Sequence, residues 1–198
     1  MNEPGMPVPC AGDALLIVDV QHDFLPGGSL AVPDGARVIA PLNRCLALFT
    51  DRGLPVLATR DWHPLDHCSF RAQGGPWPPH CVADSAGAAF PEALHLPAST
   101  PVVSKGTHAD AEAYSGFAGT DLERRLCQQD VRRLFVGGLA ADYCVARTVL
   151  DARRCGFDVV VLEDAIAAVN AHPGDGDRAI ERMKQQGAVF VNSAQLLD

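Results

Sequence analysis

The sequence lacks several features that would mark a nucleic-acid-binding or membrane protein. It has no run of Lys and Arg, and its 16 basic against 24 acidic residues give a net charge of −8. Nucleic acids and anionic membranes bind basic patches, so neither is expected as a partner. No apolar stretch approaches the ~20 residues that span a bilayer. The first residues show no basic segment followed by an apolar one, so no signal peptide is expected.

The sequence also lacks the cysteine pattern of a disulfide scaffold. Its 7 cysteines are odd in number and form no Cys-x-x-Cys pair; they stand at positions 10, 45, 68, 81, 127, 144 and 155. In a chain of 198 residues this pattern is typical of a reduced protein. We therefore expect a cytoplasmic location.

What the sequence does contain is typical of a globular protein. Hydrophobic residues make up 47% and charged residues 20% of the chain, which is an ordinary balance. No internal repeat or low-complexity tract interrupts it. The length suits one domain, which we expect to cover residues 1–198, with 1–12 loosely ordered.

Short apolar runs alternate with helical patterns along the chain. The runs predict buried strands at Ala14–Val20, Pro55–Thr59, Pro101–Ser104, Arg133–Gly138, Asp158–Leu162 and Ala188–Asn192. Helices are predicted at Ala36–Asp51, Gly119–Gln129, Asp142–Cys155 and Gly174–Gln186. Pro41 lies inside the first helix, which must therefore start late or be kinked. This alternation predicts an α/β fold of three layers, an open parallel sheet of about six strands with helices on both faces.

Two long segments interrupt the alternation, Leu25–Asp34 and Asp61–Pro97. Both are rich in Gly and Pro, and structureless loops beyond about 12–15 residues are usually functional or disordered. The composition of the second segment is not typical of a disordered one, because it contains Trp62, Trp77, His63, His67, His80 and His95. We expect an ordered loop that lines a site.

Reactive side chains stand where the predicted strands end. Asp19 lies near the end of the first strand, Asp61 and Lys105 follow the second and third, and Cys144 follows the fourth. Open parallel sheets bind ligands beyond the carboxyl ends of their strands, where the strand order reverses. In the order 3-2-1-4-5-6, the first and fourth strands are neighbours at that point. Asp19 and Cys144 would then face each other, with Lys105 and Asp61 beside them.

Cys144 is the strongest nucleophile candidate in this group. Asp142 is the expected N-cap of its helix, and both a helix N-terminus and the Lys105 ammonium would lower the thiol pKa. Asp19 follows a buried apolar run, where an acid is costly unless it is paired or carries protons. The structural alternatives are a small core residue for Cys144, a turn cap for Asp19, and a plain salt bridge between Asp19 and Lys105.

Asp61, His63 and His80 are the candidate metal ligands. Residues 61 and 63 project to the same side of an extended chain, and His80 can complete the set from the long loop. His67, four residues past His63, is a candidate fourth ligand or an outer-shell group. Carboxylate and imidazole suit zinc, iron or manganese, and three protein ligands leave room for water. The alternative is that these histidines make ordinary hydrogen bonds.

An ordered set of motifs resembles one branch of a known family. The stretches are LIVDVQHDFLPGGSL (16–30), TRDWHPLDHCSF (59–70), WPPHCV (77–82), VSKG (103–106), AYSGF (113–117) and GGLAADYCV (137–145). Together they resemble the nicotinamidase/pyrazinamidase branch of the isochorismatase-like cysteine hydrolases, over about residues 14–192. The stretch Thr107–Glu112 departs from the pattern, which puts the rim of the pocket in doubt.

The resemblance implies a set of roles for these residues. It implies a catalytic triad of Asp19, Lys105 and Cys144, and one divalent ion on Asp61, His63 and His80, with zinc preferred over iron or manganese. It also implies a cis peptide between Leu139 and Ala140, an oxyanion hole formed by the backbone N–H groups of Ala140 and Cys144, and a ring pocket. That pocket is expected to contain Phe24, Leu30, Trp77 and Tyr114.

The implied function is a metal-assisted amidohydrolase. It would convert nicotinamide, and pyrazinamide too, to the acid and ammonia through a thioester on Cys144. The partner is then a small aromatic amide, and the oligomeric state, monomer or homo-oligomer, stays open. Three alternatives remain: an amidase for N-carbamoyl compounds, whose similar enzymes generally lack the metal cluster; an isochorismatase, whose chemistry does not use the cysteine; and a non-catalytic metal-binding protein.

Overall fold

The sheet is parallel throughout and has the predicted strand order. The computed structural model describes residues 8–196. Its strands are β1 (Asp13–Val18), β2 (Val56–Asp61), β3 (Val102–Lys105), β4 (Arg133–Leu139), β5 (Asp158–Ala167) and β6 (Val189–Val191). They are ordered β3-β2-β1-β4-β5-β6, and every neighbouring pair is parallel. All of β1 is buried, as expected for a central strand covered on both faces.

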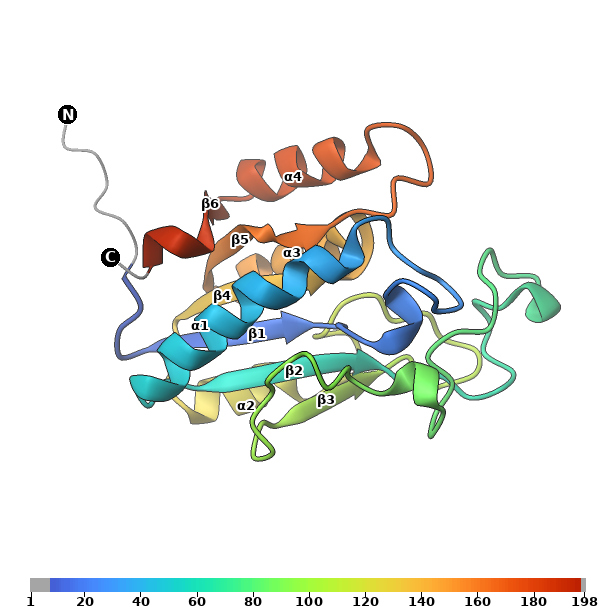
Figure 1. Ribbon diagram of the computed structural model, residues 1–198, viewed down its shortest axis with the longest axis horizontal. Coiled ribbons are helices and arrows are strands. Elements are labelled where there is room, and N and C mark those ends of the chain that lie inside the picture. Colours follow the sequence, from blue (N-terminus) through green and yellow to red (C-terminus); the bar gives the residue numbers. More distant parts are fainter. Residues whose placement is uncertain (1–7, 197–198) are drawn as a thin grey trace.

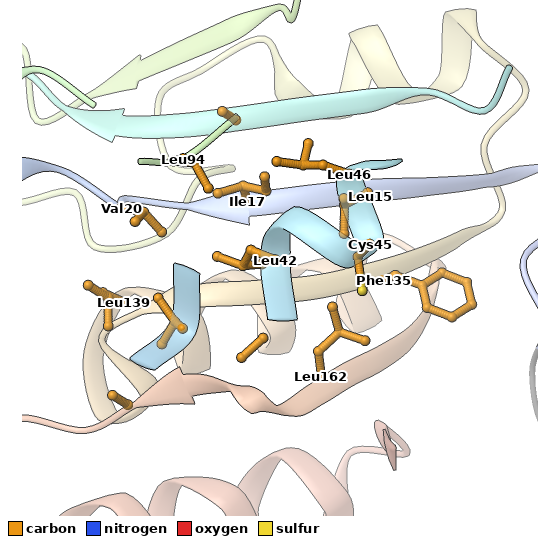
Figure 2. Close-up of a cluster of buried hydrophobic side chains, with 14 of the residues drawn as sticks. Leu15, Ile17, Val20, Leu42, Cys45, Leu46, Leu94, Phe135, Leu139 and Leu162 are labelled. Atoms are coloured by element: carbon orange, nitrogen blue, oxygen red, sulfur yellow. The ribbon is translucent and has the colours of Figure 1, made fainter. Parts of the chain in front are cut away.

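Helices cover both faces of the sheet, which confirms the three-layer prediction. They are α1 (Ile39–Asp51), α2 (Leu122–Gln128), α3 (Ala146–Arg154) and α4 (Asp175–Gln185). Figure 1 shows α1 across one face and α2 and α3 behind the sheet. The core on the α1 face packs Leu42 and Leu46 of the helix against Leu15 and Ile17 of β1 (Figure 2). A second core joins α2, α3 and α4 to the opposite face.

Two strands end later than predicted, and this changes where the reactive groups stand. Asp61 is the last residue of β2 and Lys105 the last of β3, so both are held by the sheet itself. The two residues are also register partners across the β2–β3 pair. β1 ends earlier, at Val18, and Asp19 turns the chain with a φ of 49°.

The extension of β5 was not predicted. The strand continues past Leu162 through Glu163 and Asp164 to Ala167, and its register with β4 shifts between Val136 and Gly138. The two acidic residues interrupt the apolar run, so the sequence pattern ends there although the backbone pairing continues.

The first helix starts at Ile39 and not at Ala36. A late start was one of the two alternatives predicted from Pro41, the other being a kink. A 3₁₀ turn (η2, Gly35–Val38) precedes α1. Pro41 therefore lies in the first turn of α1, where a backbone N–H has no intrahelical partner and proline costs little.

The prediction of Asp142 as a helix N-cap is wrong. A π-helical turn (η5, Ala141–Val145) precedes α3; its cap residue is Ala140, and no side chain caps it. The Asp142 carboxylate instead accepts the backbone N–H groups of Val169 and Asn170, at 2.9 and 2.8 Å. The acid therefore ties the nucleophile turn to the segment after β5.

The long loop at 61–97 is ordered, as predicted. It contains the 3₁₀ turns η3 (Arg71–Gln73) and η4 (Ala86–Ala88), and isolated bridges pair His63 with Val82 and Phe70 with Trp77. In Figure 1 this loop lies beyond the arrowheads of β1 and β2. It therefore stands over the carboxyl edge of the sheet, together with the 3₁₀ turn η1 (His22–Phe24).

The N-terminal stretch predicted to be loosely ordered falls partly outside the described residues, which begin at Val8. From there the chain is held by arginines: Arg133 donates to the Val8 carbonyl and Arg52 to the Pro9 carbonyl. Within residues 8–196, no helix has the length and apolar character needed to cross a membrane.

Candidate active site

One of the four reactive groups that the strands deliver, a buried ammonium, connects the other three. Lys105 Nζ lies 2.8 Å from Asp19 Oδ2 and 2.5 Å from Asp61 Oδ1. The same nitrogen donates to Cys144 Sγ at 3.4 Å and to the Ala113 carbonyl at 3.2 Å. The structure thus brings the predicted triad together, with Asp61 as a second carboxylate on the shared lysine.

The Asp19 carboxylate is buried and only partly satisfied. Thr59 Oγ1 donates to its Oδ1 at 2.6 Å. Its Oδ2 touches Lys105, but the ammonium is not aligned with it as a hydrogen-bond donor, and the oxygen has no other partner among the described residues. Asp19 also holds a left-handed backbone conformation, of the kind that gathers at functional sites. The under-satisfied oxygen is suited to accept a proton.

The two carboxylates on Lys105 have pKa values shifted in opposite directions. Burial raises the pKa of Asp19 above its ordinary value, against the opposing charge of Lys105. Burial acts on Asp61 as well, but Lys105 and His63 outweigh it and hold the pKa of Asp61 below its ordinary value. Paired acids whose pKa values are pushed apart mark a proton carrier and a permanent anion. Asp19 suits the first role and Asp61 the second.

The surroundings of the nucleophile candidate raise the pKa of its thiol. Burial raises the pKa of the Cys144 thiol; Lys105 opposes that rise, and the Asp19 and Asp61 carboxylates add to it. The helix N-terminus and Lys105 were expected to lower the pKa of this thiol, but burial and the two carboxylates outweigh them. The same two acids raise the pKa of Lys105 against the effect of burial, so Lys105 is suited to remain a cation beside the thiol.

The three predicted metal ligands converge beside this cluster. One ligand atom each from Asp61, His63 and His80 lies within 4.8 Å of the others, and all three residues are buried. Asp61 Oδ2 is 3.7 Å from His63 Nε2. His63 Nδ1 is bonded to the Gly106 carbonyl at 2.9 Å, and His80 Nδ1 to the Pro78 carbonyl at 2.8 Å. Metal-bound histidines usually donate their second ring nitrogen in this way, so the donor set fits a divalent ion.

His67, the candidate fourth ligand, lies outside this cluster. Its ring stacks on that of His63 with centroids 4.0 Å apart. Both of its ring nitrogens are engaged elsewhere, Nδ1 with Ser69 Oγ at 2.7 Å and Nε2 with the Ala111 carbonyl at 3.2 Å. The close metal group contains Asp61, His63 and His80 without it.

A cavity of about 30 Å³ opens onto Cys144. The four residues expected to bind the substrate ring all line it, together with the expected oxyanion position at Ala140: Phe24, Leu30, Trp77, Tyr114, Ala140 and Cys144. The expected cis peptide between Leu139 and Ala140 is present. Tyr143 also lines the cavity, and its ring centroid is 5.2 Å from that of Trp77 and 5.6 Å from that of Tyr114.

The sequence analysis did not predict two residues that fix the backbone next to the metal-ligand candidates. Gln21 is fully buried; its amide donates to the Asp61 carbonyl at 2.8 Å and accepts the Asp61 N–H at 2.8 Å. Asp23 Oδ2 accepts the backbone N–H of Cys81, next to His80, at 2.7 Å. Both belong to the motif at 16–30, but their partners lie 40 and 58 residues away along the chain, so the sequence carries no local signal for these bonds.

Comparison with known proteins agrees with this arrangement. A family model described as the isochorismatase domain matches residues 13–195. This chain belongs to the isochorismatase family.

Similar isochorismatase-family proteins cover most of the chain. The nicotinamidase/pyrazinamidase of Mycobacterium tuberculosis is 43% identical, over 91% of this chain and 99% of its own. A solved pyrazinamidase of Pyrococcus horikoshii in complex with zinc is 46% identical, with a TM-score of 0.87 over 91% of this chain and 99% of its own. PnC1 of L. infantum, solved with nicotinate, is 40% identical, with a TM-score of 0.87 over 95% of this chain and 96% of its own.

Proposed function

We propose that this isochorismatase-family protein is a nicotinamidase that also accepts pyrazinamide, releasing ammonia and the carboxylic acid. The observation that carries the proposal is the position of Lys105, whose ammonium contacts Asp19, Asp61 and Cys144 at once. The names of the similar proteins support the same substrate class. A small, largely apolar cavity walled by aromatic side chains suits a flat aromatic amide.

The chemistry of the first half-reaction follows from the proposed roles. Asp19, the under-satisfied base, removes the proton from the Cys144 thiol while Lys105 stabilises the sulfur anion. The thiolate attacks the amide carbon, and the backbone N–H groups of Ala140 and Cys144 hold the developing oxyanion; one such donor is typically worth about 2.7–4 kcal/mol. The carbon–nitrogen bond then breaks, and the proton on Asp19 passes to the leaving ammonia.

In hydrolysis of the thioester, Asp19 acts first as a base toward water and then as an acid toward sulfur. Asp19, ionised again, takes a proton from water, and the resulting hydroxide adds to the thioester carbon. The carbon–sulfur bond then breaks, and the product leaves as the carboxylic acid, which loses its proton to solvent. The proton returns to the sulfur of Cys144 as it leaves. Asp61, His63 and His80 would hold a divalent ion, zinc being the preferred one, which supplies a Lewis acid that can anchor the ring nitrogen of the substrate.

Loss of the nucleophile tests the proposal directly. Cys144→Ala is expected to lower ammonia release from nicotinamide by about three orders of magnitude or more, with metal content unchanged. The matched control is Cys155→Ala, which removes an exposed cysteine and should keep parent activity. Full activity in Cys144→Ala would reject the mechanism. Hydrolysis of N-carbamoyl compounds without hydrolysis of nicotinamide would favour the rival amidase.

A further inference from the structure

A second group of metal-type ligands lies beside the first; it shares the long loop with it and adds a residue from the segment after β3. Ligand atoms of His67, Cys68 and Glu112 all lie within 4.8 Å of one another. The group joins the long loop to the stretch Thr107–Glu112, which lies against it: the Cys68 backbone N–H donates to the Ala109 carbonyl at 2.6 Å. This stretch is also the part of the chain that departs from the family motifs.

The His67 ring is already oriented as a metal ligand would be. Its Nε2 faces the Ala111 carbonyl at 3.2 Å, and its Nδ1 accepts the Ser69 backbone N–H at 3.3 Å. These contacts assign the proton to Nε2, so Nδ1 carries the lone pair; Ser69 occupies it in this structure, and Glu112 Oε1 lies 4.0 Å from the same nitrogen. His63 and His80 show the same arrangement in the first cluster, with one ring nitrogen on a backbone carbonyl.

We propose that His67, Cys68 and Glu112 form a second metal site, for a borderline ion such as Zn²⁺ or Co²⁺. One imidazole, one thiolate and one carboxylate are ligands that zinc-type ions accept, whereas Mg²⁺ and Ca²⁺ prefer oxygen alone. Binding requires the Cys68 thiol to lose its proton to solvent. Water can complete the coordination from outside, because the Glu112 side chain is 40% exposed.

The geometry needs only a modest contraction. Zinc lies about 2.0–2.3 Å from such ligands, so two ligands of one tetrahedral ion are about 3.5 Å apart. The atoms here are within 4.8 Å, and rotation of the exposed Glu112 side chain can close the difference. Ser69 Oγ, 2.7 Å from His67 Nδ1, competes for the same lone pair. The second site should therefore fill at higher metal concentration than the first.

Cobalt binding separates the two sites, because only the second contains a thiolate once Cys144 is removed. The full chain carrying Cys144→Ala is titrated with Co²⁺, followed by equilibrium dialysis and ultraviolet absorption. We expect two ions per chain and a thiolate-to-cobalt charge-transfer band. Cys68→Ser and Glu112→Gln, each in that background, should reduce binding to one ion and remove most of the band. Cys155→Ser, at an exposed cysteine, should change neither.

Two further variants define which site is observed. His80→Ala should lose the tighter ion and keep the band, and Ser69→Ala should tighten the weaker ion by removing its competitor. A single bound ion in the Cys144→Ala parent would overturn the proposal, as would a second ion and band that survive Cys68→Ser. Because metal binding is the only readout, these outcomes do not depend on the amidase proposal.

Discussion

Gly106 shows how closely single residues are fitted at this site. It follows Lys105 at the end of β3, and its carbonyl is bonded to His63 Nδ1. Its φ is 63°, and a Cβ there would lie 2.4 Å from His63 Cε1. Glycine is required both by the backbone conformation and by the imidazole packed against it.

We therefore expect Gly106→Ala to disrupt the metal cluster. The added methyl group must displace the His63 ring, so the variant should lose metal affinity as well as stability. Gly119→Ala is the matched control, since Gly119 has a φ of 67° with nothing within 4 Å of the added Cβ. Zinc titration by calorimetry and urea unfolding measure both effects. Equal metal affinity in the two alanine variants would contradict the role given to Gly106.

The buried thiols lead to a prediction about reactivity. Burial, with the nearby Asp164 carboxylate, raises the pKa of Cys45 to about 12, so its reactive thiolate forms only well above neutral pH. At pH 8, alkylation followed by mass spectrometry should modify exposed Cys127 and leave Cys45 intact. Equal labelling of Cys45 and Cys127 in the native protein would contradict this prediction.

At the scale of elements, the aromatic wall of the cavity controls access. Trp77 comes from the long loop and Tyr114 from the segment after β3, and Trp77 Nε1 donates to the Tyr114 hydroxyl at 3.0 Å. A cavity of about 30 Å³ has room for about one water molecule. A pyridine ring needs more room than this, and we expect the two segments joined by this hydrogen bond to move apart when it enters.

Removal of that hydrogen bond should make entry easier. A neutral hydrogen bond contributes about 0.5–1.5 kcal/mol, or about 2- to 12-fold in an equilibrium. Tyr114→Phe keeps the ring and loses the bond to Trp77, so nicotinamide should associate faster by a factor in that range. Stopped-flow tryptophan fluorescence measures the rate. Phe117→Leu, a change outside the cavity, serves as control, and an unchanged or slower association in Tyr114→Phe would count against a closed wall.

The sequence predicts the elements well where a local pattern is enough, and less well where contacts are long-range. The buried runs predicted six strands, and the order 3-2-1-4-5-6 assumed for an open parallel sheet then placed Asp19, Asp61, Lys105 and Cys144 at one edge. The sequence pattern could not reveal that Gln21 holds Asp61, or that Asp142 binds Val169 and Asn170, because these bonds join segments far apart in the chain. The continuation of β5 was missed for the same reason, since pairing with β4 outweighs its polar residues.

At the scale of the whole molecule, a metal on Asp61, His63 and His80 would connect β2 to the long loop. An ion that binds only the folded state stabilises it by about 2.7 kcal/mol when its free concentration is 100 times its dissociation constant. Zinc should therefore raise the melting temperature measured by calorimetry, and a chelator should reverse the change. His80→Ala should abolish most of this response. A melting temperature that zinc does not change would contradict the metal cluster.

The four reactive side chains come from different stretches of the chain. Asp19, Asp61 and Cys144 reach the Lys105 ammonium only when β1, β2, β3 and β4 lie side by side. Before the strands pair, the two acids, the amine and the thiol are far apart along the chain and form no common site. Chemical competence therefore arises late in folding, since the long-range pairing of a parallel sheet is slow to form. We therefore expect a nascent or damaged copy with an unfinished sheet to be inactive toward amides, so that turnover reports only the molecules whose assembly is complete.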